Sequence, residues 1–212
     1  MDYELKIETI SPMCLGSGKA DINVDMDIVH DQYGLPYFPG KRLRGLLYES
    51  AVEVVEMANL CQVPFIRKQT VDELFSHVEA DVELTVPNMY LEGYSEMKQE
   101  WQYLEHKYPD IIRPESVLAA YSSIRFQTAI DEDGITKDTS LRNIRVMHAG
   151  ITFTGTLELC NAQPEHEQAL ALAVRNLRRA GINRNRGFGK FSCHLKNEQS
   201  LLDAVLEQKG GK

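Results

Sequence analysis

A glycine-interrupted basic stretch near the C-terminus constrains the fold more than any other part of this sequence. Residues 175–190 contain six basic residues and no acidic one, in a chain whose formal net charge is −8. Because glycine adopts backbone conformations that other residues avoid, Gly181, Gly187 and Gly189 predict the place where a helix ends and a strand begins. Cations and exposed N–H groups gathered in one such loop are typical of a polyanion-binding site.

The bulk composition is that of one globular domain. The chain has 212 residues, 43% of them hydrophobic and 25% charged, which suits a soluble protein. No apolar run approaches the ~18 residues of a membrane span, so we expect no membrane contact. The N-terminus lacks the basic start and apolar core of a secretory signal, and the four cysteines form no CxxC pair, so we expect reduced thiols and a cytoplasmic location. A structural zinc site would have to join Cys193 and His194 to distant residues.

The hydrophobic periodicity predicts the order of the elements. Alternation predicts strands near 2–8, 22–28, 82–86, 124–128, 151–159 and 190–195, and three-to-four spacing predicts helices near 43–60, 70–78, 94–107, 165–180 and 200–208. This order indicates an α+β fold with a ferredoxin-like core, formed by residues 1–212 as a single domain. A central insertion falls at about 60–120, and a long hairpin projects at about 122–148.

The first cationic cluster lies where the first predicted helix begins. Pro39 and Gly40 end an extended segment, and Lys41, Arg42 and Arg44 follow within one turn. Unsatisfied N–H groups and the positive end of the helix dipole make such a turn a site for phosphate. The same residues also fit an ordinary helix start with solvent-facing cations.

The second cationic cluster is the glycine-rich loop itself. A helix end at Gly181 followed by a flexible loop would explain it without a ligand. Alternatively, Gly187 and Gly189 let the backbone approach a ligand closely, with Phe188 either in the core or stacking on a base. The loop lacks the GxxxxGK[ST] order of a Walker motif.

Acidic residues alternate with apolar ones in the second predicted strand. Asp25 and Asp27 share one strand face, opposite the apolar residues. They fit either the polar outer face of an edge strand or a catalytic carboxylate. His30 follows closely, but in a continuous strand it points to the face opposite Asp25, so we expect it to be structural.

Two motifs together resemble a known family. The segment Pro39-Gly40-Lys41-Arg42-Leu43-Arg44-Gly45 and the C-terminal Asn185-Arg186-Gly187-Phe188-Gly189-Lys190 resemble the RAMP superfamily of CRISPR-associated RNA-binding proteins. The hairpin from Ile124 to Phe153 looks like the thumb of the backbone subunit of type III effector complexes. The resemblance covers roughly the first 50 and the last 90 residues. That family often has two serines where this chain has Lys41 and Arg42.

The resemblance implies an RNA-recognition-like core that polymerises along a guide RNA. The implied partners are the CRISPR guide RNA, the target RNA, other copies of the chain and other type III effector subunits. The residues implied to bind RNA are Lys41, Arg42, Arg44, Arg184, Arg186, Gly187, Phe188, Gly189 and Lys190. The residues implied to lie on the thumb are Ile130, Arg142, Arg145 and Met147.

The resemblance also implies that the chain is an endoribonuclease within the complex. The position matching the family's catalytic aspartate is Asp25, with Asp21 and Asp27 as alternates if the loop has shifted. The chemistry would be attack of a ribose 2′-hydroxyl on the adjacent phosphate, with Asp25 either positioning a divalent metal (Mg²⁺ or Mn²⁺) or taking the proton. The lack of a histidine partner favours the metal role. The alternatives are a non-catalytic assembly or capping RAMP subunit and an unrelated anion- or nucleotide-binding protein.

Overall fold

A ferredoxin-like sheet forms the body of the molecule, as the sequence predicts. The computed structural model describes residues 1–18, 24–63, 65–75, 81–109, 111, 113–128 and 141–210. The main sheet runs in the order β2-β6-β1-β7, with every neighbouring pair antiparallel. Its strands are β1 (Asp2–Thr9), β2 (Glu83–Thr85), β6 (Thr152–Cys160) and β7 (Phe191–Leu195), and the short β3 (Tyr90–Leu91) pairs with β6.

Two crossover units build this sheet. The first runs from β1 through α1 (Gly40–Leu60) to β2, and the second runs from β6 through α5 (Pro164–Asn176) to β7. In each unit the two strands are separated by a strand of the other unit, which is the split βαβ arrangement of a ferredoxin-like core. Leu5 and Ile7 of β1 and Phe153 of β6 are buried in one apolar core with Leu43 and Leu47 of α1.

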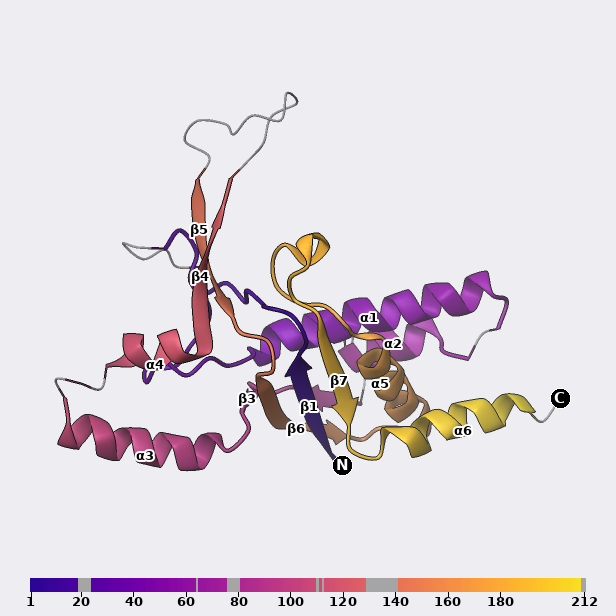
Figure 1. The fold of residues 1–212 in the computed structure, drawn as a ribbon. Helices are drawn as coiled ribbons and strands as arrows, with labels where there is room; N and C mark the ends of the chain where they lie inside the picture. Colours follow the sequence, from indigo (N-terminus) through magenta and orange to yellow (C-terminus); the bar gives the residue numbers. More distant parts are fainter. Residues whose placement is uncertain are drawn as a thin grey trace, which may run out of the picture.

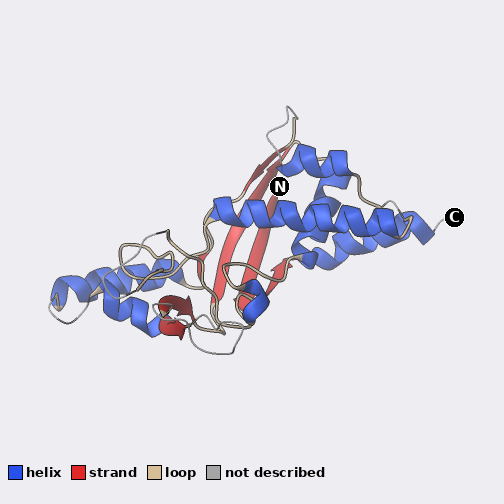
Figure 2. Ribbon diagram, turned by 90° about the horizontal axis from the view of Figure 1, so that it is seen from above, coloured by secondary structure: helices blue, strands red, loops and turns tan. Residues whose placement is uncertain are grey.

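Four further helices of the described residues surround this core or extend from it. Helix α2 (Lys68–Phe75) buries Val71, Leu74 and Phe75, and α6 (Glu198–Gly210) follows the last strand. Helix α3 (Tyr94–Lys107) has the predicted bounds and no fully buried residue. It lies with α4 (Pro114–Tyr121) on the side of the hairpin away from α1, α2 and α5, as Figures 1 and 2 show. No described helix is both long and apolar enough to cross a bilayer.

The predicted hairpin forms and projects from the body. Strands β4 (Ser122–Gln127) and β5 (Arg142–Met147) pair in a separate two-stranded sheet that stands away from the core in Figure 1. Residues 129–140, which include Ile130, lie outside the described residues.

The prediction of a strand near 22–28 is wrong for the main sheet, because the described residues of this range are not part of it. The described residues 24–30 join no strand of the main sheet and make isolated bridges instead, Met26 with Ile144, Gly16 with Ile28 and His30 with Pro36. One cause is local, because the Asp27 carboxylate accepts the N–H of Ile28 at 2.8 Å and withdraws that donor from a ladder. The segment therefore lies along β5 of the hairpin instead of beside β1.

The helix predicted to end at Gly181 ends earlier. Helix α5 stops at Asn176, and the chain then runs extended, because the carbonyl of Arg178 accepts the N–H of Phe191 in β7. Residues 179 and 190 form an antiparallel bridge. Gly181 is therefore part of the loop and not the end of a helix.

Two glycines of α1 provide a test of this packing. A Cβ at Gly40 would lie 2.2 Å from the carbonyl oxygen of Val86 and 2.5 Å from that of Pro87, whereas a Cβ at Gly45 would meet nothing within 4 Å. Gly40→Ala should therefore destabilise the fold by about 2 kcal/mol or more, because main chain must shift. Gly45→Ala should stabilise it by roughly 0.5–1 kcal/mol, because alanine favours an exposed helix interior. Urea unfolding monitored by circular dichroism would measure both, and equal effects would contradict the packing described.

Candidate nucleic-acid interface

The helix α1 start carries two exposed cations. Lys41 and Arg42 are exposed in its first turn, and no acidic residue shares that turn. The Arg42 Nη2 donates to the carbonyl oxygen of Gly16 at 2.9 Å, which holds the guanidinium against the 12–16 segment. The first helical N–H, that of Gly40, donates to the Asn88 side chain at 2.9 Å, so this donor is used within the fold. Charge at this helix start is therefore supplied mainly by the two side chains.

Arg44 points to a different environment. Its Nε and Nη2 donate to the carbonyl oxygen of Phe75 at 3.3 and 3.2 Å, and its Nη1 donates to that of Leu84. The side chain thus braces α1 against α2 and β2. A guanidinium bound to two main-chain carbonyls is a structural contact, and the structure does not place it beside Lys41 and Arg42 as a third phosphate ligand.

The glycine-rich loop is fixed at its base to the segment after β1. The N–H of Gly189 donates to Pro12, that of Ile182 donates to Cys14, and the N–H of Lys190 donates to the Ser11 hydroxyl, all within 3.1 Å. Gly189 has a φ of +74°, and a Cβ there would lie 1.9 Å from the carbonyl oxygen of Ala180. Glycine is therefore required at 189 for the close approach of two chain segments.

The tip of this loop is exposed and basic. Arg184, Asn185 and Arg186 form the short 3-10 helix η1 (Arg184–Arg186), and both arginines are exposed together with Gly187 and Lys190. Phe188 is half-buried against the core. The main-chain N–H of Gly189 is used within the fold and is not free to bind an anion. The groups of the tip that can meet an anion are therefore its exposed cationic side chains.

The two cationic clusters border the same segment. In the 12–16 segment, the carbonyl oxygen of Gly16 accepts a hydrogen bond from the Arg42 guanidinium, and that of Cys14 accepts one from the N–H of Ile182 in the loop. In addition, Arg184 Nη1 lies 3.8 Å from Glu49 Oε2, and Glu49 stands two turns after Arg42 on α1. Burial raises the pKa of the Cys14 thiol to about 11, so this residue between the clusters stays neutral.

The loop also contacts the hairpin. The Asn183 side chain donates to the Gln127 side chain of β4 at 3.2 Å. The described hairpin segments 122–128 and 141–147 contain Arg125, Arg142 and Arg145 and no acidic residue. The start of α1, the glycine-rich loop and the hairpin stem are thus connected through direct contacts.

The predicted thumb residues have different environments. Arg142 is exposed. Arg145 pairs its Nε with Asp27 Oδ1 at 2.9 Å, and both side chains are only 15% exposed. Met147 belongs to β5 but is fully buried, and its N–H donates to Met13. Arg145 and Met147 therefore lie in the largely buried base of the hairpin.

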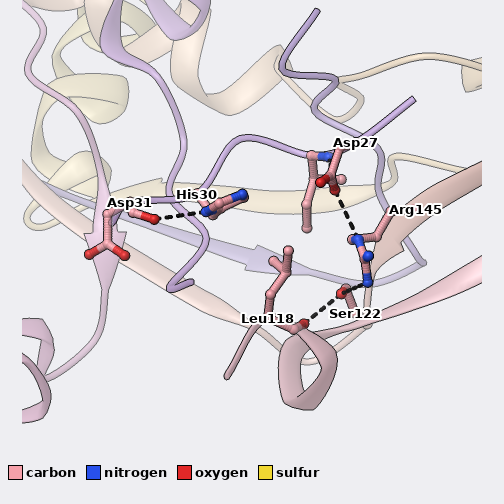
Figure 3. Close-up of polar contacts among 7 residues, drawn as sticks. Asp27, His30, Asp31, Leu118, Ser122 and Arg145 are labelled. Carbon is pink, nitrogen blue, oxygen red and sulfur yellow. Dashed lines mark hydrogen bonds and ion pairs between the residues drawn. The ribbon is translucent and has the colours of Figure 1, made fainter. Parts of the chain in front are cut away.

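The three candidate catalytic carboxylates also differ in their environments. Asp25 is exposed, its Oδ2 accepts the N–H of Asn143 at 2.8 Å, and its own N–H donates to Asn143. Asp27 is committed to Arg145, whose Nη1 lies 3.4 Å from the Ser122 hydroxyl (Figure 3). Asp21 lies outside the described residues.

His30 and Asp31, drawn in the same figure, form a separate turn. The His30 Nδ1 lies 2.7 Å from the carbonyl oxygen of Asp31 (Figure 3). The Asp31 carboxylate accepts the N–H groups of Tyr33 and Leu35. The Tyr94 hydroxyl donates to the other carboxylate oxygen at 2.8 Å, and burial together with this acidic partner raises the pKa of Tyr94. These groups shape the turn that residues 31–34 make before α1, and the contact with Tyr94 is one that the sequence did not indicate.

Metal ligation by the chain's own residues is limited. Among the residues that the structure describes, no group of three histidines, cysteines, aspartates or glutamates could together hold a metal ion. Asp25 offers one exposed carboxylate, and Mg²⁺ is commonly held by one or two carboxylates together with substrate phosphates and water. Asp25 therefore fits such an ion only if RNA supplies the remaining ligands.

Comparisons with known proteins agree with this fold. A family model described as the RAMP superfamily matches residues 6–192. A search of curated proteins finds no match. Among solved structures, a chain of the "Cryo-EM structure of the Type III-B Cmr-beta bound to cognate target RNA" is similar, with a TM-score of 0.64 and 12% identity over 95% of this chain and 99% of that one. A chain of the Type III-B Cmr-beta apo state has a TM-score of 0.60 and 12% identity over 93% and 98%.

The contacts of Asp25 and Asp27 predict losses of stability of different size. Asp27→Ala removes one partner of a largely buried ion pair and should cost about 3 kcal/mol, because Arg145 is left without its counter-charge. Asp25→Ala loses one hydrogen bond at the surface and should cost about 1 kcal/mol or less. Urea unfolding of both variants would measure the difference. A stable Asp27→Ala variant would show that this ion pair does not hold the hairpin.

Proposed function

The chain belongs to the RAMP superfamily, and we propose that it is an RNA-binding backbone subunit of a type III CRISPR effector complex that cleaves bound target RNA. The observation that carries the proposal is the joining of two cationic clusters and an arginine-bearing hairpin through the 12–16 segment. The fold similarity to chains of a Cmr-beta complex with target RNA supports it. The proposed partners are a guide RNA, a target RNA, other copies of the chain and other effector subunits.

Binding of the RNA backbone is assigned to the exposed cations. Lys41, Arg42, Arg186 and Lys190 are exposed on the connected surface, and Arg184 shares its charge with Glu49. Each cation that neutralises a phosphate releases a counterion and thereby makes binding dependent on salt. Since the chain as a whole is acidic, this basic surface favours binding along one track over general coating by RNA.

Cleavage is assigned to the Asp25 carboxylate. Its exposure leaves it accessible to an RNA strand, and its hydrogen bonds with the main chain of Asn143 fix its position beside the hairpin. In the reaction the ribose 2′-oxygen forms a bond to the adjacent phosphorus while the bond to the 5′-oxygen breaks. The 2′-hydroxyl proton passes to a base, the leaving 5′-oxygen gains a proton, and the products carry a 2′,3′-cyclic phosphate and a 5′-hydroxyl.

The role of Asp25 in this step is to accept the proton or to hold a divalent ion against the phosphate. A bound Mg²⁺ or Mn²⁺ would neutralise the charge that develops on the phosphate oxygens. Asp27 is not available for either task while it is paired with Arg145.

Removal of an exposed cation should weaken RNA binding in a salt-dependent way. Lys41→Ala and Arg42→Ala should each lower the affinity for single-stranded RNA and reduce the slope of log affinity against log salt by about 0.7, the value for one phosphate contact on a single strand. Fluorescence anisotropy across a salt titration measures both quantities. Arg67→Ala, an exposed cation after α1, is the matched control and should leave both unchanged. Unaltered binding in the first two variants would remove these positions from the RNA surface.

Loss of the Asp25 carboxylate should separate cleavage from binding. Asp25→Asn should abolish cutting of guide-matched RNA by the assembled complex in Mg²⁺ or Mn²⁺, while RNA affinity stays within about twofold, because the amide neither takes the proton nor binds the ion well. Gel analysis of the products, including the 2′,3′-cyclic phosphate end, provides the measurement. Undiminished cutting would move the role to Asp21 or to another subunit. A wild-type complex that binds target RNA without cutting it would indicate a non-catalytic assembly subunit.

A further inference from the structure

An exposed aromatic ring lies on the hairpin at the level of Asp25. Phe126 in β4 is 68% exposed, which is unusual for a phenylalanine of a folded domain. Its direct partner in β5 is Asn143, and the main chain of Asn143 exchanges hydrogen bonds with Asp25 on the opposite side. Asp25, Asn143 and Phe126 therefore form one row across three extended segments.

The three side chains of this row point to the same face of the hairpin. Directly paired residues of neighbouring strands share a face, so Phe126 and Asn143 do. Met26 is bridged to Ile144, which places the flanking residues 25 and 27 on the face of 143 and 145. The 2.9 Å contact between Arg145 and Asp27 confirms this assignment for the next row.

The spacing suits one nucleotide. Neighbouring strands lie about 4.8 Å apart, so the Asp25 and Phe126 backbones are separated by about 10 Å. A nucleotide extends over a similar length from its phosphate to the far edge of its base. A strand with a phosphate at Asp25 can therefore place an adjoining base over the Phe126 ring.

The surroundings of the ring favour RNA over a protein partner. The hairpin stem carries three arginines and no acidic residue in its described segments 122–128 and 141–147. Leu141, 63% exposed, is the other strongly exposed apolar residue of the stem, and Asn143 is polar. An aromatic ring with a neighbouring apolar side chain among arginines is the composition of a base-stacking site on single-stranded RNA.

We propose that Phe126 stacks on a nucleobase of the RNA strand held at Asp25 and thereby fixes which phosphodiester lies beside that carboxylate. This inference rests on the proposed function. It assigns Phe126 as a positioning residue, separate from the exposed cations that bind the backbone and from the carboxylate that acts on the phosphate.

The test compares Phe126→Ala and Phe126→Tyr in the full chain. RNA oligonucleotides with 2-aminopurine at single positions report stacking through quenched fluorescence, and the Asp25→Asn background keeps the RNA intact. Phe126→Ala should abolish the quenching at one position and weaken binding of a short RNA by about fivefold or more, as expected for the loss of one base–aromatic stack. Phe126→Tyr should retain both. Tyr103→Ala, an equally accessible aromatic on α3 at 59% exposure, is the matched control.

Cleavage provides a second readout with Asp25 present. In the assembled complex, Phe126→Ala should spread the cuts over neighbouring phosphodiesters and Phe126→Tyr should restore a single site, an effect that simple destabilisation would not produce. Unchanged quenching and an unchanged cut site in Phe126→Ala would overturn the inference and leave the proposed function standing. A change only in the number of copies bound per RNA would also overturn it, because the ring would then contact another copy. If the wild-type chain binds no RNA, both proposals fail.

Discussion

The ion pair between Asp27 and Arg145 is the interaction on which the placement of the hairpin depends. It joins residues 118 positions apart at 2.9 Å, and the low exposure of both side chains keeps water from competing strongly for either charge. Ser122 extends the connection, because its hydroxyl lies near Arg145 and donates to the carbonyl of Leu118 in the last turn of α4 (Figure 3). The pair thus fixes the 24–30 segment, the hairpin and α4 relative to one another, and Asp25 takes its position from that arrangement.

A second constraint acts through the main chain. The glycine-rich loop is attached to residues 10–14 by N–H groups that donate to carbonyl oxygens and to one hydroxyl. Hydrogen bonds of this kind fix backbone position without using charged side chains, so the loop can present Arg186 and Lys190 to solvent. The φ of +74° and the close approach at Gly189 make glycine necessary for this attachment, whereas at Gly187, with a φ of +82° and no atom within 4 Å of a Cβ, only the backbone conformation favours glycine.

Local patterns predicted most of the fold, and long-range contacts account for what they missed. Alternation located β1 and β6, polar helical spacing gave the bounds of α3, and alternation at 124–128 followed by the turn signal at 131–134 indicated the hairpin. No local pattern shows that Arg44 binds the carbonyl of Leu84, 40 residues away, or that Met147 is buried against Met13. A sequence also does not distinguish Asp25 from Asp27, because the two share a strand face and differ only in their partners from the hairpin. Phe126 was missed because an alternating strand predicts one buried face, and β4 has little core to cover it.

The same contacts divide the cations of the chain into two groups. Arg44 and Arg145 are used inside the fold, where they bind main-chain carbonyls and a carboxylate. The exposed cations of the α1 start, the hairpin stem and the segment from 178 to 190 are Lys41, Arg42, Arg125, Arg142, Arg178, Arg179, Arg184, Arg186 and Lys190. A cation bound inside the fold cannot neutralise a phosphate without losing those contacts, so salt-dependent binding of a polyanion would depend on the exposed group. The fold therefore decides which cations of this acidic chain, whose net charge is −8, a polyanion can reach.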